Sequence, residues 1–148
     1  MKAKDVMSSD LFSVDSVESI AGVAQIMARL DVGALPVIDG RKLVGIVTDR
    51  DLAVRGLGQG LPEDTPVSQV MSKDVETCRE SDDLDDVLEL MAQQQVRRIP
   101  VCSSSGEVVG IITMSDLARR DWDKSEVAET LSDICRPHGL HSQELQAA

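Results

Sequence analysis

Apolar residues recur with helical spacing in two stretches of this chain, one in each half. Residues 20–30 and 84–91 carry apolar side chains three and four positions apart, which predicts two amphipathic helices. Ser19 and Asp83 stand directly before these stretches and are the expected N-caps. A third helix is predicted near the C-terminus from one further apolar face: Val127, Ala128, Leu131 and Ile134.

Short apolar runs with turn signals between them predict strands around the first two helices. A brief extended segment precedes each helix, at 11–14 and at 75–78. Each helix is followed by a predicted strand pair: 34–38 with 43–47, and 99–102 with 108–112. A new helix then begins at Asp49 or Met114. Each half therefore reads β-α-β-β-α, and the predicted fold class is α/β (α+β).

The two halves are copies of one unit in tandem. Val6-Met7-Ser8 recurs 64 residues later as Val70-Met71-Ser72, and Pro36-Val37 recurs at the same offset as Pro100-Val101. The expected division is a repeat at 1–58, a linker at 59–66, a repeat at 67–122, and a helix and tail at 123–148. Because each copy alone has a thin core, we expect the copies to stack into one compact domain.

Composition narrows the classes of function. The chain of 148 residues has 26 acidic against 15 basic residues, so nucleic-acid binding by a basic face is not expected. One Phe, one Trp and no Tyr leave no platform for stacking bases. No apolar run is long enough to span a membrane, and no secretory signal is visible. Three cysteines suit a reducing cytoplasm, and Cys78 and Cys102 fall on predicted strands as core residues.

Two segments carry a family resemblance: VGALPVIDGRKLVGIVTDRDL and VRRIPVCSSSGEVVGIITMSDL. They resemble the core of the CBS domain, and the span from Val6 to Leu117 is similar to a CBS pair, or Bateman module. TDRDLAVRGLGQGLPEDTPV and QQQVRRIPV most resemble small stand-alone bacterial CBS proteins of the hypoxic-response type. The resemblance implies two units related by a pseudo-two-fold axis, disc-like homodimers, and adenine-nucleotide binding in the cleft between the units.

A Thr-x-x-Asp motif at a strand-to-helix junction is the leading candidate site. At Thr48 to Asp51 the helix start offers unpaired N–H groups to an anion, and the carboxylate can accept both hydroxyls of a ribose. Arg50 is a candidate phosphate partner. The resemblance assigns these roles to Thr48 and Asp51, and in the second copy to Thr113 and Asp116. The alternative is that Thr-x-x-Asp is a capping box with no ligand.

The second copy differs in charge from the first. It lacks a counterpart of Arg50, but Arg97 and Arg98 precede its strand pair, where the family places phosphate-binding cations. They are alternatively surface cations that balance an acidic chain. Ser13 and Thr77 match the position where the family presents a hydroxyl near the purine, or they are ordinary strand-end hydroxyls. We expect unequal sites, with the one in the first copy the stronger.

The C-terminal tail holds a weak candidate for zinc. Cys135, His138 and His141 are possible ligand types at permissive spacing, although a fourth ligand is not evident. No nucleophile has a base at a recognisable spacing, and no glycine-rich phosphate loop with its lysine occurs, so an enzyme is not expected.

The predicted function is that of a regulatory sensor. It would bind AMP, ADP or ATP with no required cofactor, form a homodimer, and signal to an unidentified protein by a conformational or dimer-packing change. The alternative is a ligand-free interaction or structural protein that acts through its dimer surface.

Overall fold

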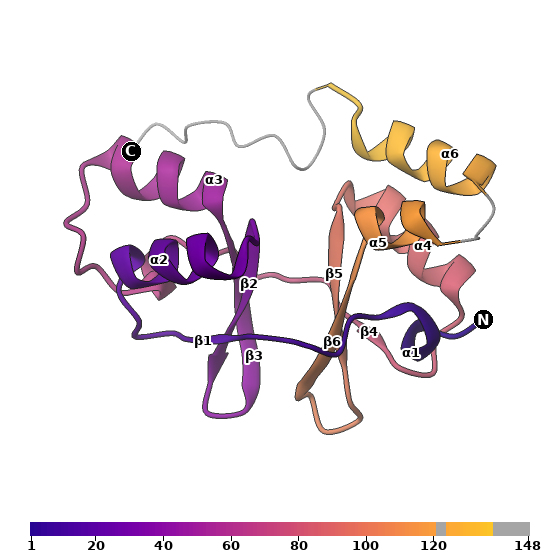
Figure 1. The fold of residues 1–148 in the computed structure, drawn as a ribbon, viewed down its shortest axis with the longest axis horizontal. Coiled ribbons are helices and arrows are strands. Elements are labelled where there is room, and N and C mark those ends of the chain that lie inside the picture. The colour runs from indigo at the N-terminus through magenta and orange to yellow at the C-terminus, as the bar shows by residue number, and fades with distance from the viewer. Residues whose placement is uncertain (121–123, 138–148) are drawn as a thin grey trace. The chain divides into compact units, whose positions relative to one another are not determined.

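The chain forms two compact units, each built around a three-stranded sheet (Figure 1). The computed structural model describes residues 1–120 and 124–137. The first unit contains residues 10–75 and 104–108, and the second contains residues 1–9, 76–103 and the described residues from 109 onward. Each unit therefore includes chain segments from both halves of the sequence.

The first unit carries the sheet of the first repeat. Its elements are β1 (Val14–Asp15), α2 (Ile20–Leu30), β2 (Ala34–Asp39), β3 (Lys42–Thr48), α3 (Asp49–Asp51), η1 (Leu52–Gly56) and η2 (Leu57–Gln59). The central strand β2 pairs in parallel with β1 and antiparallel with β3. The predicted cap of α2 is confirmed, because the Ser19 hydroxyl accepts the Gly22 N–H at 3.0 Å. The helix ends at Asp31, which adopts a left-handed conformation.

The second unit repeats this order. Its elements are β4 (Cys78–Arg79), α4 (Leu84–Gln94), β5 (Arg98–Cys102), β6 (Val108–Thr113), α5 (Met114–Arg119) and α6 (Lys124–Ile134). The strand order is β4-β5-β6, with β4 parallel to β5. The predicted β-α-β-β-α order is confirmed in both repeats, but the first strands are shorter than predicted and begin at the last residue of each predicted extended segment. No helix among the described residues is long and apolar enough to cross a bilayer.

The segments that lead into the two repeats are exchanged between the units. Helix α1 (Ala3–Val6) precedes the first repeat but belongs to the second unit, and η3 (Val67–Gln69) precedes the second repeat but belongs to the first. Ser8 exchanges two backbone hydrogen bonds with Ile111 of β6, at 2.9 and 3.1 Å. Ser72 does the same with Ile46 of β3, at 2.9 and 3.0 Å. Each leading segment thus pairs with the third strand of the other repeat's sheet.

Two glycines make this exchange possible. A Cβ atom on Gly45 would lie 2.5 Å from the Met71 sulfur and 2.7 Å from the Ser72 carbonyl oxygen. A Cβ on Gly110 would lie 2.6 Å from the Met7 sulfur. The methionine of each repeated Val-Met-Ser segment therefore packs where the strand has no side chain, which accounts for a glycine at the equivalent position of both repeats.

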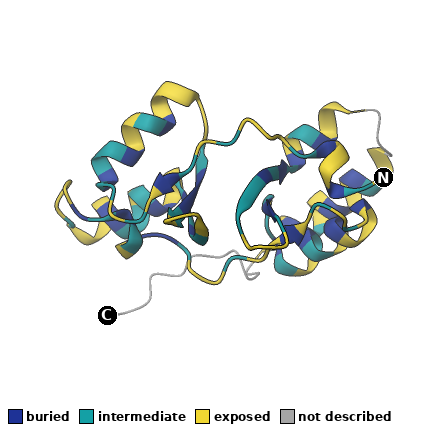
Figure 2. Ribbon diagram, turned by 90° about the horizontal axis from the view of Figure 1, so that it is seen from below, coloured by how far each residue is buried: buried dark blue, intermediate teal, exposed yellow. Residues whose placement is uncertain are grey.

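The core of each unit is aliphatic and lies between the helices and the sheet. In Figure 2 the helices are dark blue or teal along one side and yellow along the other, as amphipathic helices should be. The first core includes Val23, Leu35 and Val37, which are at most 2% exposed. The second core includes Leu84 and Ile99, each at most 1% exposed.

The predicted apolar face of α6 is partly wrong. Val127, Thr130 and Ile134 are buried, whereas Ala128 is exposed and Leu131 is 41% exposed. Helix α6 packs on α4 and α5. At about 100° per residue, Thr130 and Ile134 lie on one side of the Val127 direction and Leu131 lies on the other, so Leu131 stands at the border of the buried stripe although it is apolar.

Asp83 occupies the N-cap position of α4, but its side chain does not cap the helix. Its carboxylate instead lies 2.9 Å from the Lys2 ammonium group. This hydrogen bond raises the pKa of Lys2 and lowers the pKa of Asp83. The prediction of Asp83 as the cap is therefore correct for its position and wrong for its hydrogen bond.

Candidate functional site

The candidate residues of the first repeat lie toward one end of its sheet. Thr48 is the last residue of β3 and pairs with Ala34, the first residue of β2. The Asp49 N–H donates to the Gly33 carbonyl at 3.0 Å, which holds the junction at that edge. Ser13 directly precedes β1, which runs parallel to β2, so Ser13 lies toward the same end of the sheet with β2 between it and Thr48. The structure therefore places both predicted hydroxyls at one end of the sheet.

Thr48 and Asp51 form a reciprocal capping box. The Thr48 hydroxyl accepts the Asp51 N–H at 3.1 Å, and the Asp51 Oδ2 atom accepts the Thr48 N–H at 2.9 Å. Asp51 is only 1% exposed. The helix-capping alternative is thus realised in this structure, and a ribose would have to use the remaining acceptor capacity of a nearly buried carboxylate.

Arg55 is a partner of Asp51 that the sequence did not suggest. Its Nε atom lies 3.8 Å from the Asp51 Oδ1 atom, one helical turn away. One terminal nitrogen lies 3.5 Å from the carbonyl oxygens of Val70 and Met71, in the leading segment of the second repeat. The signal that could have found it is a repeated spacing, since an arginine follows the threonine by seven residues in both copies.

The second repeat has the same motif with a different hydrogen-bond pattern. Thr113 ends β6, and its hydroxyl accepts the Asp116 N–H at 3.1 Å and donates to the Asp116 Oδ2 atom at 2.7 Å. The Met114 N–H donates to the Arg97 carbonyl at 3.0 Å, so this junction also lies beside the start of the neighbouring strand. Both Thr113 and Asp116 are half-buried.

The arginine equivalent to Arg55 takes another partner. Arg120 follows Thr113 by seven residues, and its terminal nitrogen donates to the Asp5 carbonyl at 2.9 Å. Both arginines thus hold a leading segment through its backbone oxygens, and Arg55 in addition forms an ion pair with the aspartate of its motif. The two Thr-x-x-Asp motifs therefore differ in exposure and in their cationic neighbours.

The predicted phosphate-binding cations lie at the same two edges. Arg50 is exposed in the first unit, next to Asp51. Arg97 is exposed at the start of β5, and its guanidinium lies 3.6 Å from the Cys135 sulfur. Arg98 is the half-buried first residue of that strand. Thr77 is exposed and directly precedes β4, so the second unit holds a set comparable to that of the first.

The cysteines behave as two core residues and one surface residue. Cys78 and Cys102 are 3% and 8% exposed, which confirms their predicted place in the core. Burial raises the pKa of the Cys78 thiol to about 12 and also raises that of Cys102, so both stay protonated near neutral pH. Cys135 is exposed, while His138 and His141 of the predicted zinc cluster lie outside the described residues. Among the residues that the structure describes, no group of three His, Cys, Asp or Glu could hold a metal ion.

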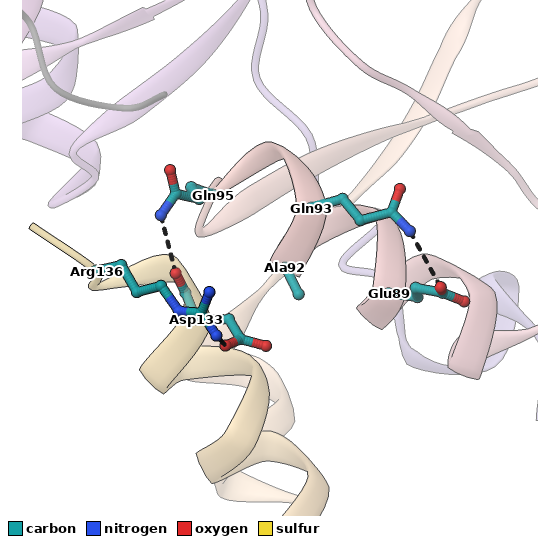
Figure 3. Close-up of a pocket in the computed structure, with 6 residues that line it drawn as sticks. All are labelled: Glu89, Ala92, Gln93, Gln95, Asp133 and Arg136. Atoms are coloured by element: carbon teal, nitrogen blue, oxygen red, sulfur yellow. Dashed lines mark hydrogen bonds and ion pairs between the residues drawn. The ribbon is translucent and has the colours of Figure 1, made fainter. Parts of the chain in front are cut away.

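A separate open pocket of about 490 Å³ lies between the C-terminal ends of α4 and α6 (Figure 3). It is lined by Glu89, Ala92, Gln93, Gln95, Asp133 and Arg136. Its polar side chains bond to one another: Gln93 to Glu89 at 3.0 Å, Gln95 to the Asp133 carbonyl at 3.0 Å, and Arg136 to the Asp133 carboxylate at 2.6 Å. None of the predicted site residues lines it, and we assign it no ligand.

Comparison with known proteins identifies the family. The model of the CBS domain matches residues 3–57 and 67–123, which cover most of the chain. The chain is a member of the CBS domain family. Among its relatives is Hypoxic response protein 1 of Mycobacterium tuberculosis, which is 33% identical over 142 residues and covers 95% of this chain and 98% of that protein. The chain is therefore a CBS pair, a type of regulatory module, and the predicted resemblance is confirmed.

Solved CBS structures show the same fold. The crystal structure of Hypoxic Response Protein I with two coordinated zinc ions superposes with a TM-score of 0.73 at 33% identity, covering 80% of this chain and 98% of that one. The CBS domain pair of protein MJ0100, in complex with 5′-methylthioadenosine and S-adenosyl-L-methionine, also has a TM-score of 0.73, at 31% identity, covering 80% of this chain and 94% of that one. The tandem β-α-β-β-α architecture is thus shared with a CBS pair that holds adenosyl ligands.

Proposed function

We propose that this CBS pair is a ligand-responsive regulatory module that binds AMP, ADP or ATP at its Thr-x-x-Asp motifs. The observation that carries the proposal is the carboxylate of Asp116. It is held at a sheet edge by the Thr113 hydroxyl at 2.7 Å and is only half-buried, so it is oriented yet within reach of a solute. The complex of the MJ0100 CBS pair with adenosyl compounds supports the same ligand class.

The chemistry of the motif suits a nucleoside. A carboxylate can accept hydrogen bonds from two adjacent hydroxyls, and a ribose offers such a pair through its 2′ and 3′ oxygens. Arg98 begins β5 and Arg97 directly precedes it, beside the Thr113 junction, where guanidinium groups could bind the ligand's phosphates. Thr77, at the neighbouring strand, is the proposed hydroxyl near the purine.

The first repeat offers an equivalent set of residues with fewer positive charges for a phosphate. Thr48 and Asp51 would bind the ribose, Arg50 a phosphate, and Ser13 would lie near the purine. The exposed guanidinium of Arg50 and the position of Ser13 at the same sheet edge support these roles. One guanidinium in place of two favours a weaker hold on a polyphosphate in this repeat, so the order we propose for the two sites is the reverse of the one expected from the sequence.

Regulation requires that the ligand bind one conformation of the protein more tightly than another. We propose that the chain acts in the cytoplasm as a homodimer whose conformation or packing changes on binding, and that a partner protein reads this change. The three cysteines, two of them buried as free thiols, support a reducing location.

A thermal-shift titration tests the proposal. A ligand at 100 times its dissociation constant stabilises the native state by about 2.7 kcal/mol, so AMP, ADP or ATP should raise the melting temperature by several degrees. Asp116→Ala should reduce the shift, whereas the control Asp64→Ala, at an exposed position of the first unit, should not. The absence of a shift with every adenosyl compound would contradict the proposal and favour the ligand-free interaction protein.

A further inference from the structure

The two copies differ most in what their equivalent arginines contact. Arg55 and Arg120 each follow the motif's threonine by seven residues, and each reaches a backbone oxygen in a leading segment. Arg55 lies in addition 3.8 Å from the Asp51 carboxylate, whereas the bond recorded for Arg120 goes to the Asp5 carbonyl. This difference lies at the group that the proposed ligand would use.

At the first site both carboxylate oxygens face protein groups. Oδ2 of Asp51 accepts the Thr48 N–H at 2.9 Å, and Oδ1 faces the Arg55 guanidinium. The Asp51 side chain is 2% exposed, and that of Arg55 is 41% exposed. A ribose hydroxyl that approaches Oδ1 would therefore compete with the guanidinium for the remaining acceptor capacity of that oxygen, and the Arg55 side chain is exposed enough to move away.

At the second site the carboxylate faces a smaller, uncharged group. Oδ2 of Asp116 accepts the Thr113 hydroxyl at 2.7 Å, and Asp116 is half-buried. A hydroxyl group rotates freely about its C–O bond, so a ribose can exchange with it without separating an ion pair.

We propose that Arg55 is an internal competitor of the ligand for Asp51, so that the Thr113–Asp116 site fills first. This inference rests on the proposed function. When the ligand does occupy the first site, Arg55 leaves Asp51, and its contacts with the Val70 and Met71 carbonyls change with it. Occupancy of the first site would thereby reach the leading segment of the second repeat, which pairs with β3 through Ser72.

The size of the competition follows from the ion pair. An ion pair with one half-exposed member, such as Arg55 with Asp51, shifts the equilibrium between the paired and the open carboxylate by up to about five-fold. The apparent affinity falls by the fraction of molecules in which the carboxylate is open, so removal of the guanidinium should strengthen the first site by about five-fold.

Calorimetric titration of the full chain with AMP tests this. In Asp116→Asn, which isolates the first site, adding Arg55→Gln should tighten AMP binding by about five-fold, whereas adding the matched control Arg120→Gln should leave it unchanged. Arg55→Lys retains a cation and should stay near the wild-type affinity. Adenosine, which has no phosphate, should show the same order, because the competition concerns the ribose.

The outcomes separate this inference from the proposed function. Failure of every variant and of the wild-type chain to bind AMP or adenosine would overturn both. Binding of AMP that Arg55→Gln leaves unchanged would overturn the inference alone, as would a loss of AMP affinity with adenosine unaffected, which would make Arg55 a phosphate ligand. Should Arg55→Gln fail to fold, the Nε–H resonance of Arg55 in the wild-type chain must shift on saturation with AMP, and an unchanged resonance would overturn the inference.

Discussion

Replacement of Gly45 by alanine should strongly destabilise the first unit. The added Cβ would lie 2.5 Å from the Met71 sulfur, whereas nonbonded heavy atoms pack best at about 3.5–4.0 Å. The Ser72 carbonyl oxygen would lie at 2.7 Å, and this atom belongs to backbone that cannot rotate away. The leading segment of the second repeat must therefore move away from β3 by about 1 Å or more.

The loss of stability has two contributions, overpacking and strained hydrogen bonds, and a gain in backbone entropy partly offsets them. Overpacking of a core typically costs about 1–3 kcal/mol. The shift also strains the two backbone hydrogen bonds between Ile46 and Ser72, of 2.9 and 3.0 Å, each of which contributes about 0.5–1.5 kcal/mol. Alanine regains about 0.5–1 kcal/mol of backbone entropy relative to glycine. We expect a net loss of about 2–4 kcal/mol in the free energy of unfolding.

Urea unfolding followed by far-ultraviolet circular dichroism measures this loss by linear extrapolation. The melting temperature should fall by about 5–15 °C. Gly110→Ala should cost less, because its Cβ would lie 3.0 Å from the backbone oxygen of Ser8. Gly58→Ala is the control, since its nearest contact would be 3.2 Å, to the Ala53 carbonyl. A Gly45→Ala chain within about 0.5 kcal/mol of wild type would refute the account of the exchanged segments.

Two further predictions concern a helix cap and the thiols. Ser19→Ala should lower the free energy of unfolding by about 1 kcal/mol, because it removes a cap hydrogen bond of 3.0 Å. Asp83→Ala removes an exposed ion pair and should cost less. Urea titration of both variants checks this order, and the reverse order would be inconsistent with the structure. In a thiol-reagent assay near neutral pH, Cys135 should react quickly, and the buried Cys78 and Cys102 should react after denaturant is added; equal rates for all three would contradict their assigned burial. The pKa of Cys78 is raised from 9.0 to about 12, so its contribution to stability is complete below pH 9 and is lost as the pH rises toward 12. Cys78→Ala should therefore lose less stability over that range than the wild-type chain, and equal losses would count against the raised pKa.

The repeated β-α-β-β-α order was predictable because each element depends on residues that are close together in the sequence. Apolar spacing reports the buried side of α2, and Ser19 contacts a residue three positions away. The face of α6 was harder, because the neighbouring helix selects which of several apolar positions is buried. Leu131 is 41% exposed while Thr130 is buried, although leucine is the more apolar residue.

The site was predictable in its motifs but not in its surroundings. Spacing alone identifies Thr48 and Asp51 as a possible capping box, and the structure shows that box. The role of Arg55 depends on carbonyls 15 and 16 residues away, and that of Arg120 on a carbonyl 115 residues away. Such contacts follow from the exchange of leading segments, which no local pattern of residues records.

The nucleotide-binding role remains the central claim, and a crystal structure of the full chain grown with AMP tests it most directly. In this structure we expect the 2′ and 3′ hydroxyls of the ribose to lie within about 3.2 Å of the Asp116 carboxylate oxygens. Thr113 and Arg97 should lie beside the nucleotide. A ribose bound away from both Thr-x-x-Asp motifs, or no nucleotide in crystals grown at saturating AMP, would contradict the claim.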